Sequence, residues 1–401
     1  MASDRTSVAA VLYDGSRFRT RWFYGLAPLL LAAALVVFFL RFGPLGVFQA
    51  AFPPVDQLTV NRVALSPGSF TISVTNGGPS QVTVAQVLVD EAYWQHTIIP
   101  APTIPRLSSA TITVLYPWVE GETHKLTLMT PTGLTFTHTV EVATESPRPN
   151  PLFFLTFSLL GIYVGVIPVF LGVLWFPFLR TLERRWLHFF LSLTAGLLVF
   201  LGIDAITEAL ESAQTLPGAF QGTALVTIGV VASVLALIAV GRIARQRQPM
   251  SVLLVTAFMI ALGIGLHNLG EGLAIGAAYN LGKVSLGTFL VIGFMLHNIT
   301  EGLGIVAPIA HQRTSYRHLI ALGAVAGLPT ILGTWLGGFT YWPVLATLFL
   351  AVGAGAIFQV VYQVHKLMVA ETEKNLASLL NLAGFALGLL IMYVTGLIVA
   401  V

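Results

Sequence analysis

The chain has 401 residues, of which 56% are hydrophobic and only 9% are charged, whereas soluble domains carry about 25% charged residues. This balance predicts a membrane protein rather than a soluble domain. The absence of cysteine excludes disulfides, thiolate metal ligands and cysteine nucleophiles, so any metal would be bound by His, Glu, Asp or Asn, a ligand set that suits zinc, iron and manganese.

Residues 1–50 are predicted to form a cytoplasmic N-terminus and a signal-anchor transmembrane helix. An apolar span covers roughly residues 22–47 and follows a short segment with four arginines. The small-residue cleavage site in "GVFQAAF" is weak, so an uncleaved anchor is favoured over a cleaved signal peptide.

Residues 51–148 differ in character and are predicted to form a small, all-β domain outside the cytoplasm. Stretches such as "GSFTISVTN" and "SATITVLYPW" alternate apolar and polar residues, and Gly, Pro, Asn and Ser separate them. Six or seven short strands at roughly ten-residue spacing are typical of a β-sandwich.

Residues 149–401 are apolar and helical, and they contain eight further spans. The loops that would face the cytoplasm hold most of the basic residues: Arg180, Arg184, Arg185, Arg242, Arg245, Arg247, Arg313, Arg317, Lys366 and Lys374. Only Lys283 lies in a short outer loop. This positive-inside pattern places the C-terminus and the β-domain outside. It also accounts for most of the basic excess, so the pI near 9.2 gives no reason to expect a nucleic-acid partner.

Two similar motifs lie in these apolar spans: "HNLGEG" begins at His267 and "HNITEG" begins at His297. In each, the His, the Asn and the Glu fall within one arc of about 100° on a helix. The two helices would run antiparallel around a turn near residues 280–285, which places both motifs near mid-bilayer. Ionisable groups in a membrane are costly and usually mark an ion or proton path. A structural polar lock is the alternative, but two copies at matched depth favour a metal site with four strong ligands: the imidazoles of His267 and His297 and the carboxylates of Glu271 and Glu301.

Three further acids, Asp204, Glu208 and Glu211, occupy one stripe at the outer end of another span. Two interpretations are equally compatible with the sequence. The stripe forms an entrance that attracts cations, or it is the solvated end of a helix.

The eight-span region resembles the ZIP family of divalent-metal transporters. The two motifs are similar to the family's HNxPEG and HxxPEG motifs, "IDAITEALE" resembles an acidic stretch in its second helix, and "LPTILGTWLGG" resembles its sixth-helix segment. The resemblance covers about residues 151–401, so the fold class is a polytopic α-helical membrane protein with a ZIP-like eight-helix bundle, preceded by one extra transmembrane helix and the β-domain. It implies a transport site made from His267, Asn268, Glu271, His297, Asn298 and Glu301. It also implies an elevator-like movement of family helices one, four, five and six against the other four, and a homodimer is common in the family. We expect the protein to lie in the plasma membrane.

The chain departs from the family pattern at several positions. Gly270 and Thr300 replace the motif prolines, which puts the expected helix distortion in doubt. Leu328 stands where relatives can carry a Glu that would help to hold a second ion. Gln359 and Gln363 likewise stand in a stretch where relatives carry Glu.

These features together predict transport of a divalent metal, with Zn2+ as the expected substrate and with breadth to Fe2+, Mn2+ and Cd2+. Two alternatives stay open. An intramembrane metal-dependent hydrolase would use an open metal position to activate water, although no general base in an H-E-x-x-H arrangement is present. A metal-gated receptor would use the β-domain to bind a partner.

Overall fold

The structure is a computed structural model that describes residues 26–38, 56–247, 251–339, 342–371 and 378–399. The chain divides into two compact units, Met1–Pro54 and Val55–Val401. In the first unit the described residues form one apolar helix, Leu26–Phe38. At 13 residues this part is too short to span a bilayer, and the rest of the expected first span lies outside the described residues. The extra transmembrane helix therefore stays a prediction.

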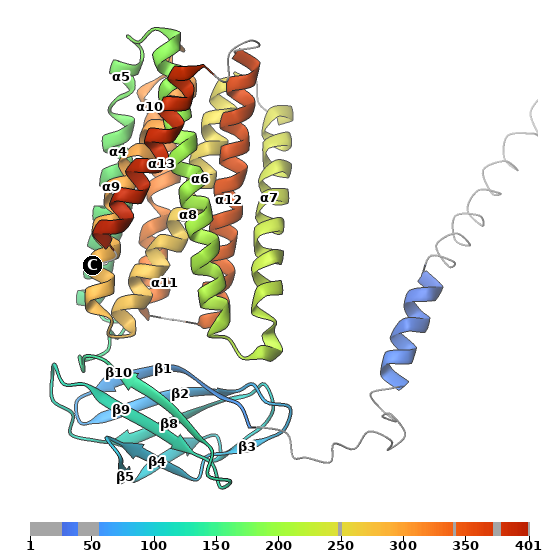
Figure 1. Cartoon of the computed structure of the whole chain (residues 1–401), viewed down its shortest axis with the longest axis vertical. Helices are drawn as coiled ribbons and strands as arrows, with labels where there is room; N and C mark the ends of the chain where they lie inside the picture. Colours follow the sequence, from blue (N-terminus) through green and yellow to red (C-terminus); the bar gives the residue numbers. More distant parts are fainter. Residues whose placement is uncertain (1–25, 39–55, 248–250, 340–341, 372–377, 400–401) are drawn as a thin grey trace, which may run out of the picture. The chain divides into compact units, whose positions relative to one another are not determined.

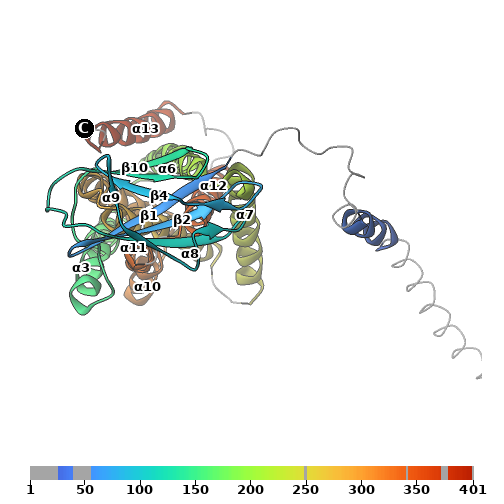
Figure 2. The same cartoon turned by 90° about the horizontal axis from the view of Figure 1, so that it is seen from below.

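The β-region of the second unit is a sandwich of two four-stranded antiparallel sheets with a small two-stranded sheet beside them (Figures 1 and 2). One sheet has the order β1-β2-β8-β6 and the other β10-β9-β4-β5. The strands are β1 (Leu58–Ser66), β2 (Ser69–Asn76), β3 (Val82–Thr83), β4 (Gln86–Val89), β5 (Ala92–Trp94), β6 (His96–Ile99), β7 (Thr103–Ile104), β8 (Ser109–Leu115), β9 (His124–Met129) and β10 (Thr135–Val140).

The sandwich forms because its strands alternate. In β8 the side chains of Ala110, Ile112 and Val114 are buried while their neighbours are exposed or partly exposed. In β9, Leu126 and Leu128 are buried in the same way. Successive side chains of a strand point to opposite faces of its sheet, so these residues meet in one apolar core between the sheets.

Eight helical spans long and apolar enough to cross a membrane follow, so the chain is a multi-pass membrane protein. The first span combines α3 (Pro151–Gly161), a π-helical turn η1 (Ile162–Val166), α4 (Ile167–Val173) and α5 (Phe176–Leu179). The others are α6 (Arg184–Gln214), α7 (Gly222–Arg247), α8 (Val252–Asn280), α9 (Val284–Val306), α10 (Tyr316–Gly327) continued by α11 (Pro329–Phe339), α12 (Pro343–Glu371) and α13 (Leu379–Val399). Short 3₁₀ turns, η2 (Gly218–Phe220) and η3 (Ala307–Ile309), adjoin α7 and α9.

The helices are not equally buried. The spans of α6, α8 and α12 are the most enclosed, whereas those of α7 and α13 are the least. Figures 1 and 2 show α7 and α13 at the periphery of the bundle in both views. The two motif helices are thus flanked by other helices, and α8 is one of the three central ones.

Glycines bring some helices together at the backbone level. A Cβ atom added to Gly272 on α8 would lie 2.2 Å from the Thr330 carbonyl oxygen of α11, and one added to Gly302 on α9 would lie 2.1 Å from the Val169 carbonyl oxygen of α4. Small residues permit such close approach between membrane helices. The first span, α8, α9 and the α10–α11 span are therefore packed as one closely fitted group, which we call the motif group.

The remaining spans, α6, α7, α12 and α13, form a second group with the same kind of packing. A Cβ atom on Gly388 of α13 would lie 2.2 Å from the Leu193 carbonyl oxygen of α6, and one on Gly355 of α12 would lie 2.4 Å from the Val230 carbonyl oxygen of α7. We call these four helices the outer group.

Candidate metal site

The two motif helices form an antiparallel pair, α8 and α9, joined by the short turn Leu281–Lys283. Gly282 adopts a positive φ of 73° in this turn, a conformation that glycine takes at little cost. Both helices are continuous through their motifs, and neither Gly270 nor Thr300 interrupts them. The distortion that motif prolines would cause is thus absent from α8 and α9.

Glu271 connects the two motifs. Its Oε1 atom lies 3.1 Å from His267 Nε2 on its own helix and 2.5 Å from His297 Nε2 on α9. Its Oε2 atom accepts a hydrogen bond of 3.1 Å from Asn298 Nδ2. A carboxylate accepts hydrogen bonds only, so both imidazoles donate through Nε2 and are held facing it. The two helices are joined at this depth by polar contacts in an otherwise apolar bundle.

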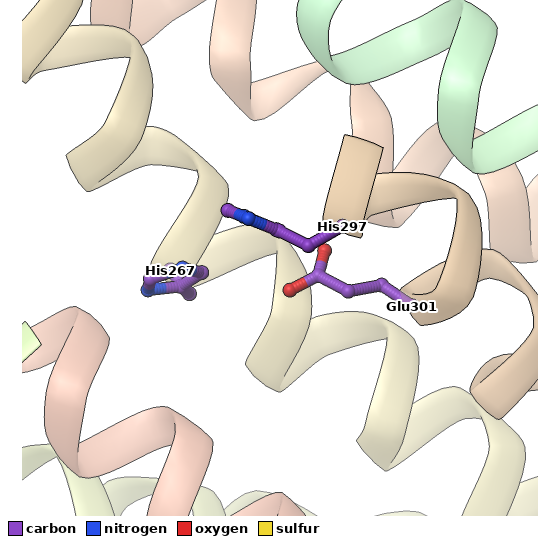
Figure 3. A group of neighbouring side chains, drawn as sticks. All are labelled: His267, His297 and Glu301. Carbon is purple, nitrogen blue, oxygen red and sulfur yellow. The ribbon is translucent and has the colours of Figure 1, made fainter. Parts of the chain in front are cut away.

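Glu301 has no such partners. Its side chain is buried, and neither carboxylate oxygen has a hydrogen-bond partner among the described residues. His267, His297 and Glu301 can each offer one ligand atom, and these three atoms all lie within 4.8 Å of one another. Figure 3 shows the three side chains pointing toward a common space. An unpaired buried carboxylate is very costly, and a divalent cation bound among these atoms would offset that cost.

The two asparagines are completely buried beside these residues. Asn268 Nδ2 donates to the Ala326 carbonyl oxygen at 3.1 Å, and Asn298 Nδ2 donates to the Val164 carbonyl oxygen at 3.0 Å. Among the described residues, neither Oδ1 atom has a hydrogen-bond partner. The six side chains predicted from the two motifs therefore gather in one place, where they present unpaired oxygens.

A small space links this cluster to the acidic stripe of α6. Asp204 and Glu208 line it from one side, and His267 and Glu271 line it from the other. Its volume of about 10 Å³ corresponds to about one water molecule. Asp204 and Glu208 of the acidic stripe thus lie next to the metal-site cluster.

A larger cavity of about 620 Å³ continues from there toward the end of the bundle where α8 turns into α9. Asp204, Glu208 and Glu211 line it together with His297 at its inner end and Lys283 from the turn. This volume can hold a hydrated ion, and three carboxylates against one lysine leave it acidic.

The opposite side of the cluster is packed with apolar side chains. Ile264 and Ile260 lie about one and two turns before His267 on α8, and both are fully buried in a core with Leu198, Leu303 and Val360. Such apolar side chains offer water and ions little polar surface. The larger cavity described above extends from the cluster toward the opposite end of the bundle.

Three residues singled out in the sequence lie elsewhere. Leu328 is 49% exposed on the surface of the bundle, so the expectation that a carboxylate at this position would help to hold a second ion was wrong. The side chain points away from the interior, where the ligands are. Gln359 and Gln363 are buried on α12, but neither lines the two cavities described above.

Sequence reasoning did not identify the two carbonyls that hold the asparagines. A backbone carbonyl has no residue signature. The available signal was a proline near each of them: Pro168 follows Val164 by four residues, and Pro329 follows Ala326 by three.

Comparison with known proteins gives one match. Residues 241–396, which include both motifs and five of the eight spans from the end of α7 to α13, match the model of the ZIP zinc transporter family. No curated protein matches the chain. The resemblance found in the sequence is confirmed over this segment, and the family's function is divalent-metal transport.

Proposed function

We propose that this protein is a ZIP-family transporter that moves a divalent metal ion, with Zn2+ as its main substrate, through a site formed by His267, Asn268, Glu271, His297, Asn298 and Glu301. The observation that carries the proposal is the buried Glu301 carboxylate, which has no partner and lies beside two imidazoles. Imidazole and carboxylate ligands suit Zn2+, Fe2+ and Mn2+, and such ligand sets select among these ions by geometry and availability more than by intrinsic affinity. We therefore expect some breadth toward Fe2+, Mn2+ and Cd2+.

The access route supports transport rather than static binding. The acidic cavity would collect cations and bring them past Asp204 and Glu208 to the site, while the apolar core on the other side prevents leakage. The positive-inside pattern supports an orientation in which the open end of the cavity faces away from the cytoplasm. In the plasma membrane, this orientation would make the conformation an outward-open state.

Release to the other side requires relative movement of helices, and the packing favours an elevator-like movement of the motif group against the outer group. Within each group, glycines face backbone carbonyls of neighbouring helices at 2.1 to 2.4 Å from an added Cβ. Between the groups the closest contacts are to side chains, because Gly263 faces Val360 Cγ2 and Gly304 faces Thr194 Cγ2. Backbone atoms of the other group lie further away, at 3.2 Å for Ala356 O from a Cβ on Gly263 and for His267 Cα from one on Gly353. Side chains can change rotamer as two surfaces slide, whereas interlocked backbones cannot.

Metal flux into sealed proteoliposomes tests the proposed function. Purified full-length protein is expected to carry Zn2+ down its gradient, and protein-free liposomes serve as the control. Zn2+ binding without flux would overturn the proposal and favour a metal-gated receptor. Zn2+ binding accompanied by hydrolysis of a substrate, again without flux, would favour the metal-dependent hydrolase.

The elevator-like movement has its own test, made simple by the absence of native cysteine. A disulfide between Thr194→Cys and Gly304→Cys joins the two groups and is expected to stop flux until a reductant is added. The matched control joins Phe157→Cys on α3 with Gly338→Cys on α11, which are neighbours within the motif group, and is expected to leave flux intact. Equal flux in the oxidised and reduced cross-group variant would contradict the movement.

A further inference from the structure

A proline outside the motifs, Pro168, is placed to control the ligand asparagine Asn298. We propose that Pro168 is a positioning residue, and that it leaves the Val164 carbonyl available to hold the Asn298 amide so that its oxygen is available to the metal ion. The inference rests on the proposed metal site.

The first carbonyl is that of Val164, in the π-helical turn of the first span. The N–H of Ile167 bonds to the Ile162 carbonyl, one residue further back than in an α-helix. The carbonyl of Val164 would be bonded in an α-helix by the N–H of residue 168, but proline has none. Val164 O instead accepts the hydrogen bond from Asn298 Nδ2 on α9.

The second carbonyl is that of Ala326, where the helix changes from α10 to α11. Leu328 N–H still bonds to Ala324 O, and Ile331 N–H bonds to Leu328 O. Pro329 lies between these two bonds, but the carbonyl whose α-helical donor it removes is that of Val325, four residues earlier. The α-helical donor of Ala326 O would be the N–H of Thr330, so the missing N–H of a proline frees the Val164 carbonyl alone. Ala326 O accepts the hydrogen bond from Asn268 Nδ2 on α8.

The chemistry of these contacts fixes which way each amide faces. A carbonyl oxygen can only accept a hydrogen bond, so the NH2 end of each asparagine must point toward it. In Asn298 the same Nδ2 also donates to Glu271 Oε2 at 3.1 Å, so the Val164 carbonyl and the Glu271 carboxylate hold this amide together. The Oδ1 atom then points away, and in both residues it is buried without a partner among the described residues. An oriented amide oxygen that lacks a donor is a suitable ligand for a cation.

The arrangement gives a physical role to helix irregularities that lie on the neighbours of the motif helices. Outer contacts that hold metal ligands in place typically contribute about 10- to 100-fold to metal affinity or activity. If Pro168 acts through Asn298, its contribution must disappear when the asparagine is removed.

A double-mutant cycle tests this dependence. The Kd for Zn2+ would be measured by titration calorimetry on full-length protein in detergent, for the wild type, Pro168→Ala, Asn298→Ala and the double variant. Pro168→Ala restores an N–H that competes for Val164 O, and we expect the Kd to rise about tenfold. In the Asn298→Ala background the same change should alter the Kd by less than about twofold.

Controls separate positioning from a general loss of structure. Pro177→Ala lies in α5 of the same span, at an exposed position, and is expected to leave the Kd unchanged. Pro168→Val, which restores the same N–H with a side chain of similar size, repeats the cycle with Asn298→Ala in case Pro168→Ala does not fold.

The outcomes divide clearly. An equal rise in Kd with and without the asparagine, or no rise in the wild-type background, overturns the positioning role while leaving the metal site in place. A wild-type protein that does not bind Zn2+ overturns the proposed function as well as this inference.

Discussion

His297 on α9 and Glu271 on α8 are joined by a contact of 2.5 Å between Nε2 and Oε1. The same oxygen also contacts His267 Nε2 at 3.1 Å. One carboxylate therefore orients both imidazoles across two antiparallel helices, while Glu301 is left without a partner. Glu271 and Glu301 have different surroundings, although they occupy equivalent places in the two motifs.

Removal of either carboxylate should remove most of the transport. We expect Glu271→Ala and Glu301→Ala, as well as His267→Ala and His297→Ala, each to reduce Zn2+ uptake into proteoliposomes at least tenfold at matched protein incorporation. The physical reason is that each variant loses a ligand or the group that orients two ligands. Glu183→Ala serves as the control, because Glu183 is exposed beside Arg185. Wild-type uptake in both motif Glu variants would disprove the proposed site.

The residue at the place of the second motif proline gives another test. Thr300 lies within the continuous helix α9, and its hydroxyl donates to the His297 carbonyl at 2.6 Å. We expect Thr300→Pro to destabilise the protein by about 3 kcal/mol, because proline in a helix interior removes a backbone hydrogen bond and clashes with the preceding turn. Thr300→Ala keeps the backbone N–H and should cost much less. Thermal unfolding in detergent measures both, and a Thr300→Pro variant as stable as the wild type would show that α9 accepts a proline at this position.

The sequence predicted the spans, the β-sandwich and the six motif residues because each has a clear pattern: apolar length, alternation, or a repeated His-Asn-x-x-Glu. It did not predict which way Leu328 faces. In a membrane bundle, lipid-facing and interior positions are both apolar, so periodicity does not separate them as it does in water. The carbonyls of Val164 and Ala326 were missed for another reason, since their availability depends on helix irregularities rather than on side chains.

The sandwich has a carboxylate whose state should affect its stability. Partial burial alone would raise the pKa of Asp90, but hydrogen bonds from the Lys125 N–H, His124 and Tyr116 outweigh it and hold the pKa below its ordinary value. A pKa lower in the folded than in the unfolded state adds stability above the unfolded pKa of about 3.9, and this is lost as pH falls through the folded pKa.

We therefore expect Asp90→Asn to lower the unfolding temperature of the sandwich at neutral pH. The fall of this temperature at acid pH should also be smaller in the variant than in the wild type. Intrinsic fluorescence of Trp94 and Trp118, both partly buried against the sandwich core, follows this transition in the full chain. Glu91→Gln, at the neighbouring exposed position, is the control. An acid transition identical in Asp90→Asn and the wild type would contradict the assigned role of the hydrogen bonds.

The division into residues 1–50, 51–148 and 149–401 can be tested by truncation. The six motif residues and the acidic stripe all lie after residue 149. We expect a chain without residues 1–148 to bind Zn2+ with a Kd within about threefold of the full protein, provided that it inserts in the same orientation. Protease accessibility of the Arg180–Arg185 loop checks the orientation. A correctly inserted truncated protein without Zn2+ binding would show that the N-terminal regions contribute to the site.

The number of ions follows from the charges at the site. Glu271 and Glu301 supply two negative charges, the imidazoles bind metal as neutral ligands, and one divalent ion brings the cluster to zero. A second ion would leave uncompensated positive charge in an apolar environment, which is strongly disfavoured. We expect one tightly bound Zn2+ per chain, measured by metal analysis of purified protein without excess metal.

Two variants make this expectation specific. Leu328→Glu should leave the stoichiometry at one, because residue 328 lies on the exposed surface of the bundle. Asp204 and Glu208 are neighbouring carboxylates that could bind a second ion, since they line the small space beside His267 and Glu271. Any second ion should therefore require them and should be lost in Asp204→Asn with Glu208→Gln. Two fully occupied ions that persist in this double variant would refute the charge argument, because no further carboxylate lines that space.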